Sequence, residues 1–507
     1  MAASALTIHE LLDGSPAAAI ALEAPGRAAL TYAGLREQLQ YTVRALNSLG
    51  VGRNDAVAIV LPNGPEMASA FLCVAAGATT APLNPAYKAD ELEFYLADLQ
   101  ARLVIVAEGS DTPAIAVAQR LGIPLATLSV AAGSPAGSFR LSGTPAKART
   151  PGLATRADVA LVLHTSGTTS RPKVVPLTHA NVCTSAANIA RSLVLAPAEK
   201  CLNVMPLFHI HGLIAALLSS LSAGASVVCS SGFNALQFFG LLKDHQPSWY
   251  TAVPTMHQAI LARAARNPDA VHATKLRLIR SSSASLPPQV MLELEKVFGA
   301  PVIEAYGMTE AAHQMASNPL PPAPRKPGSV GIAAGPEVAI MDDTGRLLPQ
   351  GEIGEVVIRG DNVTPGYANN PTANAAAFTH GWCRTGDQGV LDEQGYLRLT
   401  GRLKEIINRG GEKISPREVD EVLLDHPAVA QAVTFGVPHD KLGEDVAAAV
   451  VLNEGASATE RELRDFVGER LAAMKVPRQV LFLAEIPKGA TGKLQRIGLA
   501  KLLGLAS

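Results

Sequence analysis

Short apolar runs alternate with amphipathic segments along the first three-fifths of the chain. Runs rich in β-branched residues include DAVAIVL (55–61), ARLVIVAE (101–108), ASVVCS (225–230) and LRLIRSSS (276–283), and Ala- and Leu-rich segments separate them up to about residue 310. Continuous apolar runs are typical of strands that are buried on both faces of a parallel sheet. The alternation therefore predicts an α/β fold of parallel sheets covered by helices.

The pattern changes between about Gly328 and Thr400, where short β runs are separated by the turn formers Asp-Thr-Gly, Pro-Gln-Gly and Glu-Gln-Gly. This texture predicts a small antiparallel barrel or sandwich. Beyond Gly401 a helical segment, EVDEVLLDHP, and a strand-like run, VAAAVVLN, return. We therefore predict a large N-terminal domain over residues 1–402, with a barrel-like part at about 328–400, and a small mobile α+β domain over residues 403–507.

One uncharged run, from Leu213 to Ser230, approaches the length of a membrane span. Serine and glycine interrupt it, which favours a buried helix followed by a strand over a span.

Composition narrows the function classes. A chain of 507 residues with 48% apolar and 17% charged residues is typical of a large, well-buried enzyme. Its net charge of -1 gives no overall attraction to nucleic acid or to an anionic membrane. The five cysteines form no C-x-x-C pair, so neither a disulfide framework nor a zinc site is indicated. The first residues, MAASALTIHELLDG, lack the features of a signal or transit peptide, and the final LAS differs from the peroxisomal address, so we expect a cytoplasmic protein.

The segment from His164 to His179 reads HTSGTTSRPKVVPLTH and gathers hydroxyl and cationic side chains. It follows the run DVALVLH, which predicts a buried strand, and Thr178 can cap a following helix. Open α/β sheets bind ligands where loops leave the carboxyl ends of strands. Hydroxyls, backbone N–H groups and a lysine suit a polyphosphate, here from Thr165, Ser166, Gly167, Thr168, Thr169 and Lys173. The Walker A pattern is absent, and a plain surface loop is the alternative.

Two carboxylate clusters follow strand-like or turn segments. In EAYGMTEAAH (304–313), Glu310 stands beside Thr309, a pair that suits Mg²⁺ together with phosphate oxygens; a helix cap by Thr309 is the alternative. In WCRTGDQG, Asp387 could accept hydrogen bonds from both hydroxyls of a ribose, and an Asx turn is the alternative.

Two basic clusters lie nearer the C-terminus. GRLKEIINRGGEKISPREVD carries Arg402, Lys404, Arg409 and Lys413 around a Gly-Gly pair at the predicted domain boundary, where a solvated linker is the alternative. IPKGATGKLQR carries Lys488 and Lys493 on a glycine-bearing turn, and exposed lysines without a role are the alternative.

Taken together and in this order, the five clusters resemble the adenylate-forming superfamily of acyl-CoA synthetases, 4-coumarate-CoA ligases and luciferases. The resemblance runs from LTYAGLREQL (30–39) to Lys493, nearly the whole chain. The segments PLFHIHGL, SWYTAVPTMHQ, RSSSASL, AYGMTEAAHQMASNPLP and NRGGEKISP are most similar to the oxalate-CoA ligases of plants and fungi. The resemblance implies that MgATP and a carboxylate form an acyl-adenylate and pyrophosphate, and that the thiol of coenzyme A then displaces AMP.

The resemblance also implies roles for individual residues. The loop from Thr165 to Lys173 would hold the β- and γ-phosphates, Thr309 would contact phosphate, and Glu310 would bind Mg²⁺. Asp387 and Arg402 would hold the ribose. The adenine pocket would be lined by Ser283, Ala284, Ser285, Glu304, Ala305, Tyr306 and Gly307.

The C-terminal clusters would serve the two half-reactions. Lys493 would reach the α-phosphate and the substrate carboxylate during adenylation, where positive charge stabilises two approaching anions. Lys404 would be the hinge about which the small domain rotates, bringing the segment of Gly410, Gly411 and Lys413 to the site for thioester formation.

The chain departs from the superfamily at one place in the first motif. Where the superfamily reads P-K-G, this chain has Pro172, Lys173 and Val174. If that glycine serves to allow a positive φ, the β-branched Val174 would resist it and phosphate binding by the loop would change.

For the acyl substrate we expect oxalate, because burying its second carboxylate demands polar or cationic partners. By motif position these would be His209, Ser283 and His313, and His313 would lie one helical turn after Thr309. The alternatives are a 4-coumarate-like or medium-chain acyl-CoA ligase and, in a different class, a nucleotide-binding pseudoenzyme. We expect small-molecule partners only, no membrane span, and a monomer or weak dimer.

Overall fold

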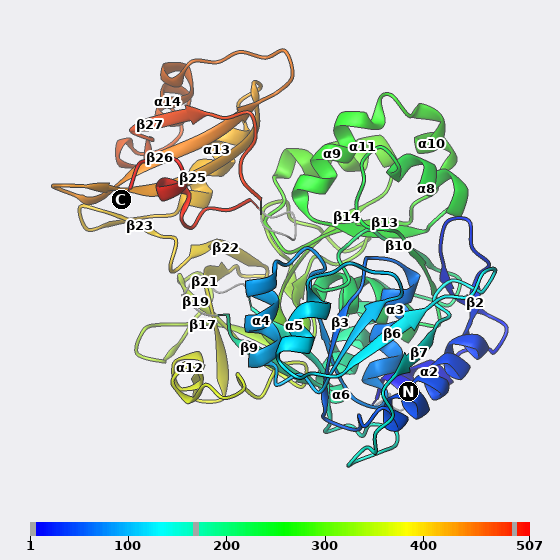
Figure 1. Cartoon of the computed structure of the whole chain (residues 1–507). Helices are drawn as coiled ribbons and strands as arrows, with labels where there is room; N and C mark the ends of the chain where they lie inside the picture. Colours follow the sequence, from blue (N-terminus) through cyan, green and yellow to red (C-terminus); the bar gives the residue numbers. More distant parts are fainter. Residues whose placement is uncertain (1–6, 166–171, 489–493, 507) are drawn as a thin grey trace.

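The structure, a computed structural model, describes residues 7–165, 172–488 and 494–506 (Figure 1). A seven-stranded sheet has the order β7-β6-β5-β3-β4-β8-β9. Its centre is parallel and comprises β3 (Ala56–Val60), β4 (Thr79–Pro82), β5 (Leu103–Ala107), β6 (Leu125–Ser129) and β8 (Val159–His164). Its edges are antiparallel and comprise β7 (Arg140–Gly143) and β9 (Val174–Thr178).

A nine-stranded sheet has the order β16-β15-β14-β13-β12-β10-β11-β1-β2. The parallel strands are β1 (Ile20–Glu23), β10 (Lys200–Asn203), β11 (Ser226–Cys229), β12 (Trp249–Ala252), β13 (Leu278–Ser281) and β14 (Val302–Met308). The antiparallel strands are β2 (Leu30–Thr31), β15 (His313–Ser317) and β16 (Ile332–Ala333). The predicted α/β fold class is confirmed, with antiparallel strands added at the edges.

Helices cover both faces of the two sheets. The outer face of the seven-stranded sheet packs against α4 (Ala89–Asp98) and α5 (Ala114–Arg120). The outer face of the nine-stranded sheet packs against α8 (Phe238–His245), α9 (Pro254–Ala264), α10 (Pro268–Ala273) and α11 (Pro288–Phe298). The largest apolar core lies between the sheets and includes α1 (Ile8–Asp13), α2 (Tyr32–Ser48), α3 (Pro65–Ala75) and α6 (His179–Ser192).

Two local predictions are confirmed in this core. Helix α6 begins after Thr178, whose hydroxyl accepts a hydrogen bond from the backbone N of Asn181 at 3.2 Å. The uncharged run forms a buried π-helix, η1 (His211–Leu218), then α7 (Ser219–Ser222) and strand β11. Among the described residues, no helix has both the length and the apolar character that a membrane crossing requires.

The next segment forms a six-stranded antiparallel sheet. Its strands are β17 (Glu337–Met341), β18 (Leu347–Leu348), β19 (Gly354–Arg359), β20 (Phe378–Thr379), β21 (Trp382–Leu391) and β22 (Leu397–Arg402), with α12 (Pro371–Ala377) before β20. Its strand order is β18-β17-β19-β21-β20, and β22 pairs with β21. The short strand β16, at the start of the predicted barrel-like part, pairs instead with β15 of the nine-stranded sheet.

The C-terminal part lies as a separate lobe beside the large body (Figure 1). Its five-stranded sheet contains β23 (Ile407–Arg409), β24 (Glu412–Ile414), β25 (Val429–His439), β26 (Gly443–Leu452) and β27 (Gln479–Phe482). Apolar residues of α13 (Pro416–Leu424) and α14 (Glu460–Gly468) cover one face. The short helix α15 (Leu499–Leu502) packs on the other face, and η3 (Ala473–Lys475) precedes β27.

Candidate active site

A cavity of about 360 Å³ lies where the nine-stranded sheet, the antiparallel sheet and the C-terminal lobe meet. It gathers eight of the residues that the sequence predicted to bind nucleotide: Ser283, Ala284, Ser285, Ala305, Tyr306, Gly307, Asp387 and Arg402. The C-terminal lobe contributes the charged residues Arg417, Asp420, Glu421 and Arg496 to the same cavity. Segments far apart in the sequence thus form one concave site whose lining combines apolar and charged side chains.

Asp387 is held by two partners at the wall of this cavity. Arg402 Nε donates to Asp387 Oδ1 at 2.9 Å across neighbouring strands, and the hydroxyl of Tyr306 donates to Asp387 Oδ2. The Asp387 charge raises the pKa of Arg402, and burial with the same charge raises the pKa of Tyr306. Asp387 lies within strand β21, so the Asx-turn alternative is wrong.

Glu304 lies behind the cavity wall instead of lining it. Its side chain is 1% exposed, and Oε1 accepts a hydrogen bond from the backbone N of Leu286 at 2.9 Å. Among the described residues Oε2 has no hydrogen-bond partner, and burial raises the pKa of Glu304 to about 7. The prediction that Glu304 lines the pocket is therefore corrected: a buried carboxyl here positions the 283–287 segment.

Glu310 belongs to a second cluster of polar side chains, together with Tyr367 and Lys173 from other segments. It lies in a short 3₁₀ helix, η2 (Thr309–Ala311), and its Oε1 accepts a hydrogen bond from the hydroxyl of Tyr367 at 2.8 Å. Lys173 Nζ lies 4.4 Å from the centre of the Tyr367 ring, a cation–π contact. Burial raises the pKa of Glu310, while the Tyr367 hydrogen bond and the Lys173 charge oppose that rise. No local pattern in the sequence indicated Tyr367.

The helix-cap alternative for Thr309 is also wrong. Thr309 is the first residue of η2, Met308 is its N-cap, and no side chain caps this helix. Within the part of the chain that the structure describes, no group of three or more His, Cys, Asp or Glu side chains could hold a metal ion. A cation at Glu310 would therefore need oxygen ligands from a bound molecule, as Mg²⁺ takes from phosphates.

The predicted phosphate loop lies between β8 and β9, and the sequence analysis missed the second of these antiparallel strands. Its ends are tied together, because Thr165 N donates to Lys173 O at 3.0 Å and Lys173 N donates to Thr165 Oγ1 at 3.3 Å. Ser166, Gly167, Thr168 and Thr169 lie outside the described residues. Val174 is the first residue of strand β9 and pairs with His164. Its φ is not positive, so a β-branched side chain fits this position without strain.

Ser283 and His313 come together around a histidine that the sequence analysis missed. His211 Nδ1 lies 3.0 Å from Ser283 Oγ, and the ring centres of His211 and His313 are 5.1 Å apart. His209 lies beside the start of η1, where its Nδ1 accepts a hydrogen bond from the backbone N of His211 at 3.3 Å. The motif PLFHIHGL contains both histidines, and its spacing alone did not decide between them.

The prediction that His313 lies one helical turn after Thr309 is wrong. Helix η2 ends at Ala311, Ala312 and His313 have φ values of 47° and 103°, and His313 pairs with Met308 across an antiparallel hairpin. A Cβ on Gly307 would lie 2.0 Å from His313 O, so only glycine fits there. A tight hairpin therefore replaces the expected helix, and the residue spacing in the sequence did not indicate it.

The C-terminal candidates that the structure describes lie in two turns and on the short strand β24. Lys404 is exposed in the turn after β22, and Lys413 is exposed on β24. Gly410 and Gly411 form the two-residue turn between β23 and β24, with φ values of 61° and 97° that suit a type I′ hairpin. Lys493 lies outside the described residues.

Arg496 ties the end of the chain to the segment after β22. Its Nη1 donates to Glu405 Oε2 at 3.0 Å, and its Nη2 donates to Asp420 Oδ2. Burial raises the pKa of Asp420 to about 6, while the Arg496 charge opposes the rise. The sequence analysis did not single out any of these three residues.

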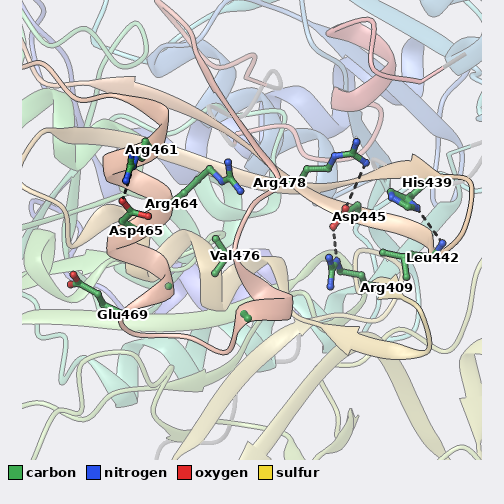
Figure 2. A pocket seen from close by; sticks show the side chains of 12 residues that line it. Arg409, His439, Leu442, Asp445, Arg461, Arg464, Asp465, Glu469, Val476 and Arg478 are labelled. Carbon is green, nitrogen blue, oxygen red and sulfur yellow. Dashed lines mark hydrogen bonds and ion pairs between the residues drawn. The ribbon is translucent and has the colours of Figure 1, made fainter.

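A second cavity, of about 1090 Å³, lies on the C-terminal lobe (Figure 2). Arg409 Nε pairs with Asp445 Oδ1 at 2.6 Å, and Arg461 Nε lies 3.6 Å from Asp465 Oδ2. In the described part of the chain Arg464 has no ion pair. The charged lining residues are Arg409, Arg461, Arg464, Arg478, Asp445, Asp465 and Glu469, so arginines outnumber carboxylates.

Comparison with known proteins places these features in a family. The model of the AMP-binding enzyme family matches residues 12–368, and that of the AMP-binding enzyme C-terminal domain matches residues 418–493. An oxalate–CoA ligase of Arabidopsis thaliana is 48% identical over 483 residues, which are 94% of either chain. An oxalate–CoA ligase of Saccharomyces cerevisiae is 44% identical over 90% of this chain and 88% of its own. The crystal structure of ATP-bound MatB from Rhodopseudomonas palustris has a TM-score of 0.88 at 28% identity, over 98% of both chains.

Proposed function

Because the chain belongs to the AMP-binding enzyme family, we propose that it is an ATP-dependent oxalate–CoA ligase that forms oxalyl-CoA, AMP and diphosphate through oxalyl-adenylate. In the first step a carboxylate oxygen of oxalate attacks the α-phosphorus of ATP and diphosphate leaves. In the second step the thiol of coenzyme A attacks the acyl carbon and AMP leaves. The observation that carries the proposal is the cavity between the two sheets and the C-terminal lobe, which is lined by eight of the predicted nucleotide-binding residues.

The nucleoside would bind along the walls of this cavity. Asp387 would accept hydrogen bonds from the ribose hydroxyls, since Tyr306 and Arg402 already fix the orientation of its carboxylate. The adenine would lie against the segments 283–285 and 305–307, which line the cavity beside Asp387.

The phosphates would bind near Lys173 and Glu310. Lys173 and the hydroxyls of the 165–169 segment offer charge and donors, and Thr309 adds another hydroxyl. Glu310 fits Mg²⁺, because a single buried carboxylate together with phosphate oxygens is a ligand set that this ion accepts. When bound, Mg²⁺ would neutralise charge on the phosphates. Lys493 would stabilise the charge on the α-phosphate and the attacking carboxylate.

The C-terminal part would serve the thioester step. We propose a domain boundary between residues 402 and 403, with Lys404 as the hinge and the turn of Gly410 and Gly411, with Lys413, facing the site in the second pose. Coenzyme A carries several phosphate groups, and the arginine-rich cavity beside Arg409 suits such an anion.

Oxalate is the proposed acid because the buried groups at the end of the site are polar. An aromatic or fatty acid would need an apolar tunnel, whereas Ser283 and His313 can donate hydrogen bonds to a second carboxylate, with His211 beside both. The identity of 44% and 48% to oxalate–CoA ligases supports the same substrate. We further propose that the enzyme acts in oxalate catabolism in the cytoplasm, as a monomer or weak dimer.

The proposal is tested by a substrate panel with the purified protein. Diphosphate release and loss of free thiol are measured with ATP, Mg²⁺, coenzyme A and oxalate, acetate, malonate, octanoate or 4-coumarate. We expect oxalate to be consumed far better than the others, and His313→Ala to lose most oxalate activity while ATP still binds. Activity on 4-coumarate or octanoate without oxalate would contradict the substrate, and no diphosphate release with any acid would favour a pseudoenzyme.

A further inference from the structure

Arg280 is a buried cation with no counter-ion among the described residues. It lies on β13, its side chain is fully buried, and its Nε has no hydrogen-bond partner within the described part of the chain. Three residues earlier, Arg277 is only partly buried and pairs with Glu199 at 2.6 Å. Burying a charge without an ion pair is costly, so a buried guanidinium with no carboxylate partner in the described part of the chain favours an anion brought by a bound molecule.

The groups that contact Arg280 include no carboxylate, and one of them, His211, belongs with Ser283 to the cluster proposed for the acyl end of the site. Its Nη1 lies 3.4 Å from both His211 Nε2 and Thr251 Oγ1, and its Nη2 lies 3.3 Å from Gln314 Oε1. These contacts are long for charge-assisted hydrogen bonds, which are usually below about 3 Å. Burial lowers the pKa of Arg280 to about 9, which leaves the guanidinium charged at neutral pH.

Arg280 also determines which nitrogen of His211 carries the proton. A guanidinium only donates, and Thr251 Oγ1, which lies 2.6 Å from His211 Nε2, can donate to the same nitrogen. His211 Nε2 is therefore the acceptor, and the proton sits on Nδ1, which donates to Ser283 Oγ at 3.0 Å. The hydroxyl proton of Ser283 is then free to point into the cavity that Ser283 lines.

We propose that Arg280 is the positioning residue that makes the acyl site selective for acids with a second negative charge, acting through His211 and Ser283. It orients the Ser283 hydroxyl toward the distal carboxylate of the substrate, and its charge stabilises that carboxylate in a buried site. The inference rests on the proposed function, because it concerns the acid that is adenylated there.

The test compares oxalate with oxamate, which has the same skeleton but an uncharged amide in place of one carboxylate. Diphosphate release is measured for wild type, Arg280→Met, Arg280→Gln and Arg280→Lys. We expect Met and Gln to lower kcat/KM for oxalate by about 100-fold and to change that for oxamate far less, whereas Lys keeps most of the preference. The KM for ATP should stay within about twofold, and the apo melting temperature should stay equal or rise, because an unpaired buried charge is removed.

Arg277→Met is the matched control and should leave the ratio of oxalate to oxamate activity unchanged, since its ion pair lies away from His211. If Met fails to fold, Gln keeps a hydrogen-bonding side chain and tests the charge alone. Equal losses on oxalate and oxamate would overturn the inference. A wild-type enzyme that uses only acids with a single carboxylate would overturn both the inference and the proposed substrate. If the wild-type enzyme uses oxalate and Arg280→Met and Arg280→Gln keep its ratio of oxalate to oxamate activity, the inference about Arg280 is overturned and the proposed substrate stands.

Discussion

Arg402 donates to Asp387 at 2.9 Å, and the register of β21 and β22 places the two residues directly opposite each other. Because the hydroxyl of Tyr306 binds the second carboxylate oxygen, the orientation of Asp387 is fixed before any ligand arrives. A carboxylate that is prepared in this way loses little freedom when it binds a pair of hydroxyls.

Asp387→Asn should therefore weaken ATP binding without a comparable effect on the acid. The variant keeps the shape of the side chain and loses the charge that Arg402 and Tyr306 face. Hydrogen bonds to a charged group are each worth about 1.5–3 kcal/mol, so the KM for ATP should rise about 10- to 100-fold. Steady-state kinetics with either substrate varied measures the change. Asp392→Asn, which removes the partner of Lys326 outside the cavity lining, is the control, and an unchanged KM for ATP would contradict the ribose role of Asp387.

Tyr367→Phe should move the acid side of the pH profile to higher pH. The Tyr367 hydroxyl stabilises the charged form of Glu310 and so lowers its pKa. Without that hydrogen bond the pKa of Glu310 rises further, and the carboxylate that would bind Mg²⁺ is lost at a higher pH. The measurement is kcat/KM for MgATP as a function of pH, in which the pH of the acid-side midpoint is compared between the two proteins.

The chain offers a matched control in Tyr396→Phe. Tyr396 also lies under a lysine, Lys326, at 4.3 Å, but its hydroxyl donates to Pro324 O. Its pH profile should coincide with that of the wild type. A Tyr367→Phe profile that coincides as well would show that the hydroxyl does not act on the ionisation of Glu310.

Glu304→Gln should stabilise the protein at alkaline pH relative to acid pH. Since burial raises the pKa of Glu304 to about 7, the folded state holds this proton more tightly than the unfolded chain does. The resulting stability is fully present below about pH 4.5 and is lost as the pH rises through about 7. Glutamine stays neutral, so the variant should gain about 2.5 kcal/mol relative to the wild type between pH 5 and pH 8. Thermal melts of both proteins at the two pH values measure it, and a pH-independent difference would refute the shifted pKa.

Lys493→Ala should abolish adenylation and spare the thioester half-reaction. A positioned positive charge of this kind is worth about 10²- to 10³-fold in rate, and it is needed only where the carboxylate meets the α-phosphate. Diphosphate release measures the first half-reaction, and thioester formation from preformed oxalyl-adenylate measures the second. Lys501→Ala, an exposed change on α15, is the control. Equal loss of both half-reactions would argue against a role in one pose only.

The sequence predicted the elements better than their contacts. Continuous apolar runs predicted strands such as β8 and β13, and the hydroxyl of Thr178 predicted the start of α6, because these signals are local. Strand β9 was missed because its five residues contain a proline and only a short apolar run, and its pairing with β8 supplies the stability.

The site residues that were missed depend on tertiary contacts. Tyr367 reaches Glu310 from 57 positions further along the chain, and Arg280 reaches His211 from 69 positions away. Between His209 and His211 the choice depends on how η1 winds, and His313 was misplaced because a hairpin with two positive φ values replaced the expected helix. Local spacing carries no information on either point.

The winding of η1 has a consequence for how the substrate range can change. A π-helix bonds residue i to i+5 and holds one more residue per turn than neighbouring α segments would, and His211 stands at its start. Deleting a single codon within 211–218 would let the segment rewind as an α-helix with its flanks nearly in register, so that the side chains within it, His211 among them, would change direction while the rest of the fold stays in place. Loss or gain of one residue in this helix, more than exchange of side chains, is thus a route by which relatives could acquire a different acid.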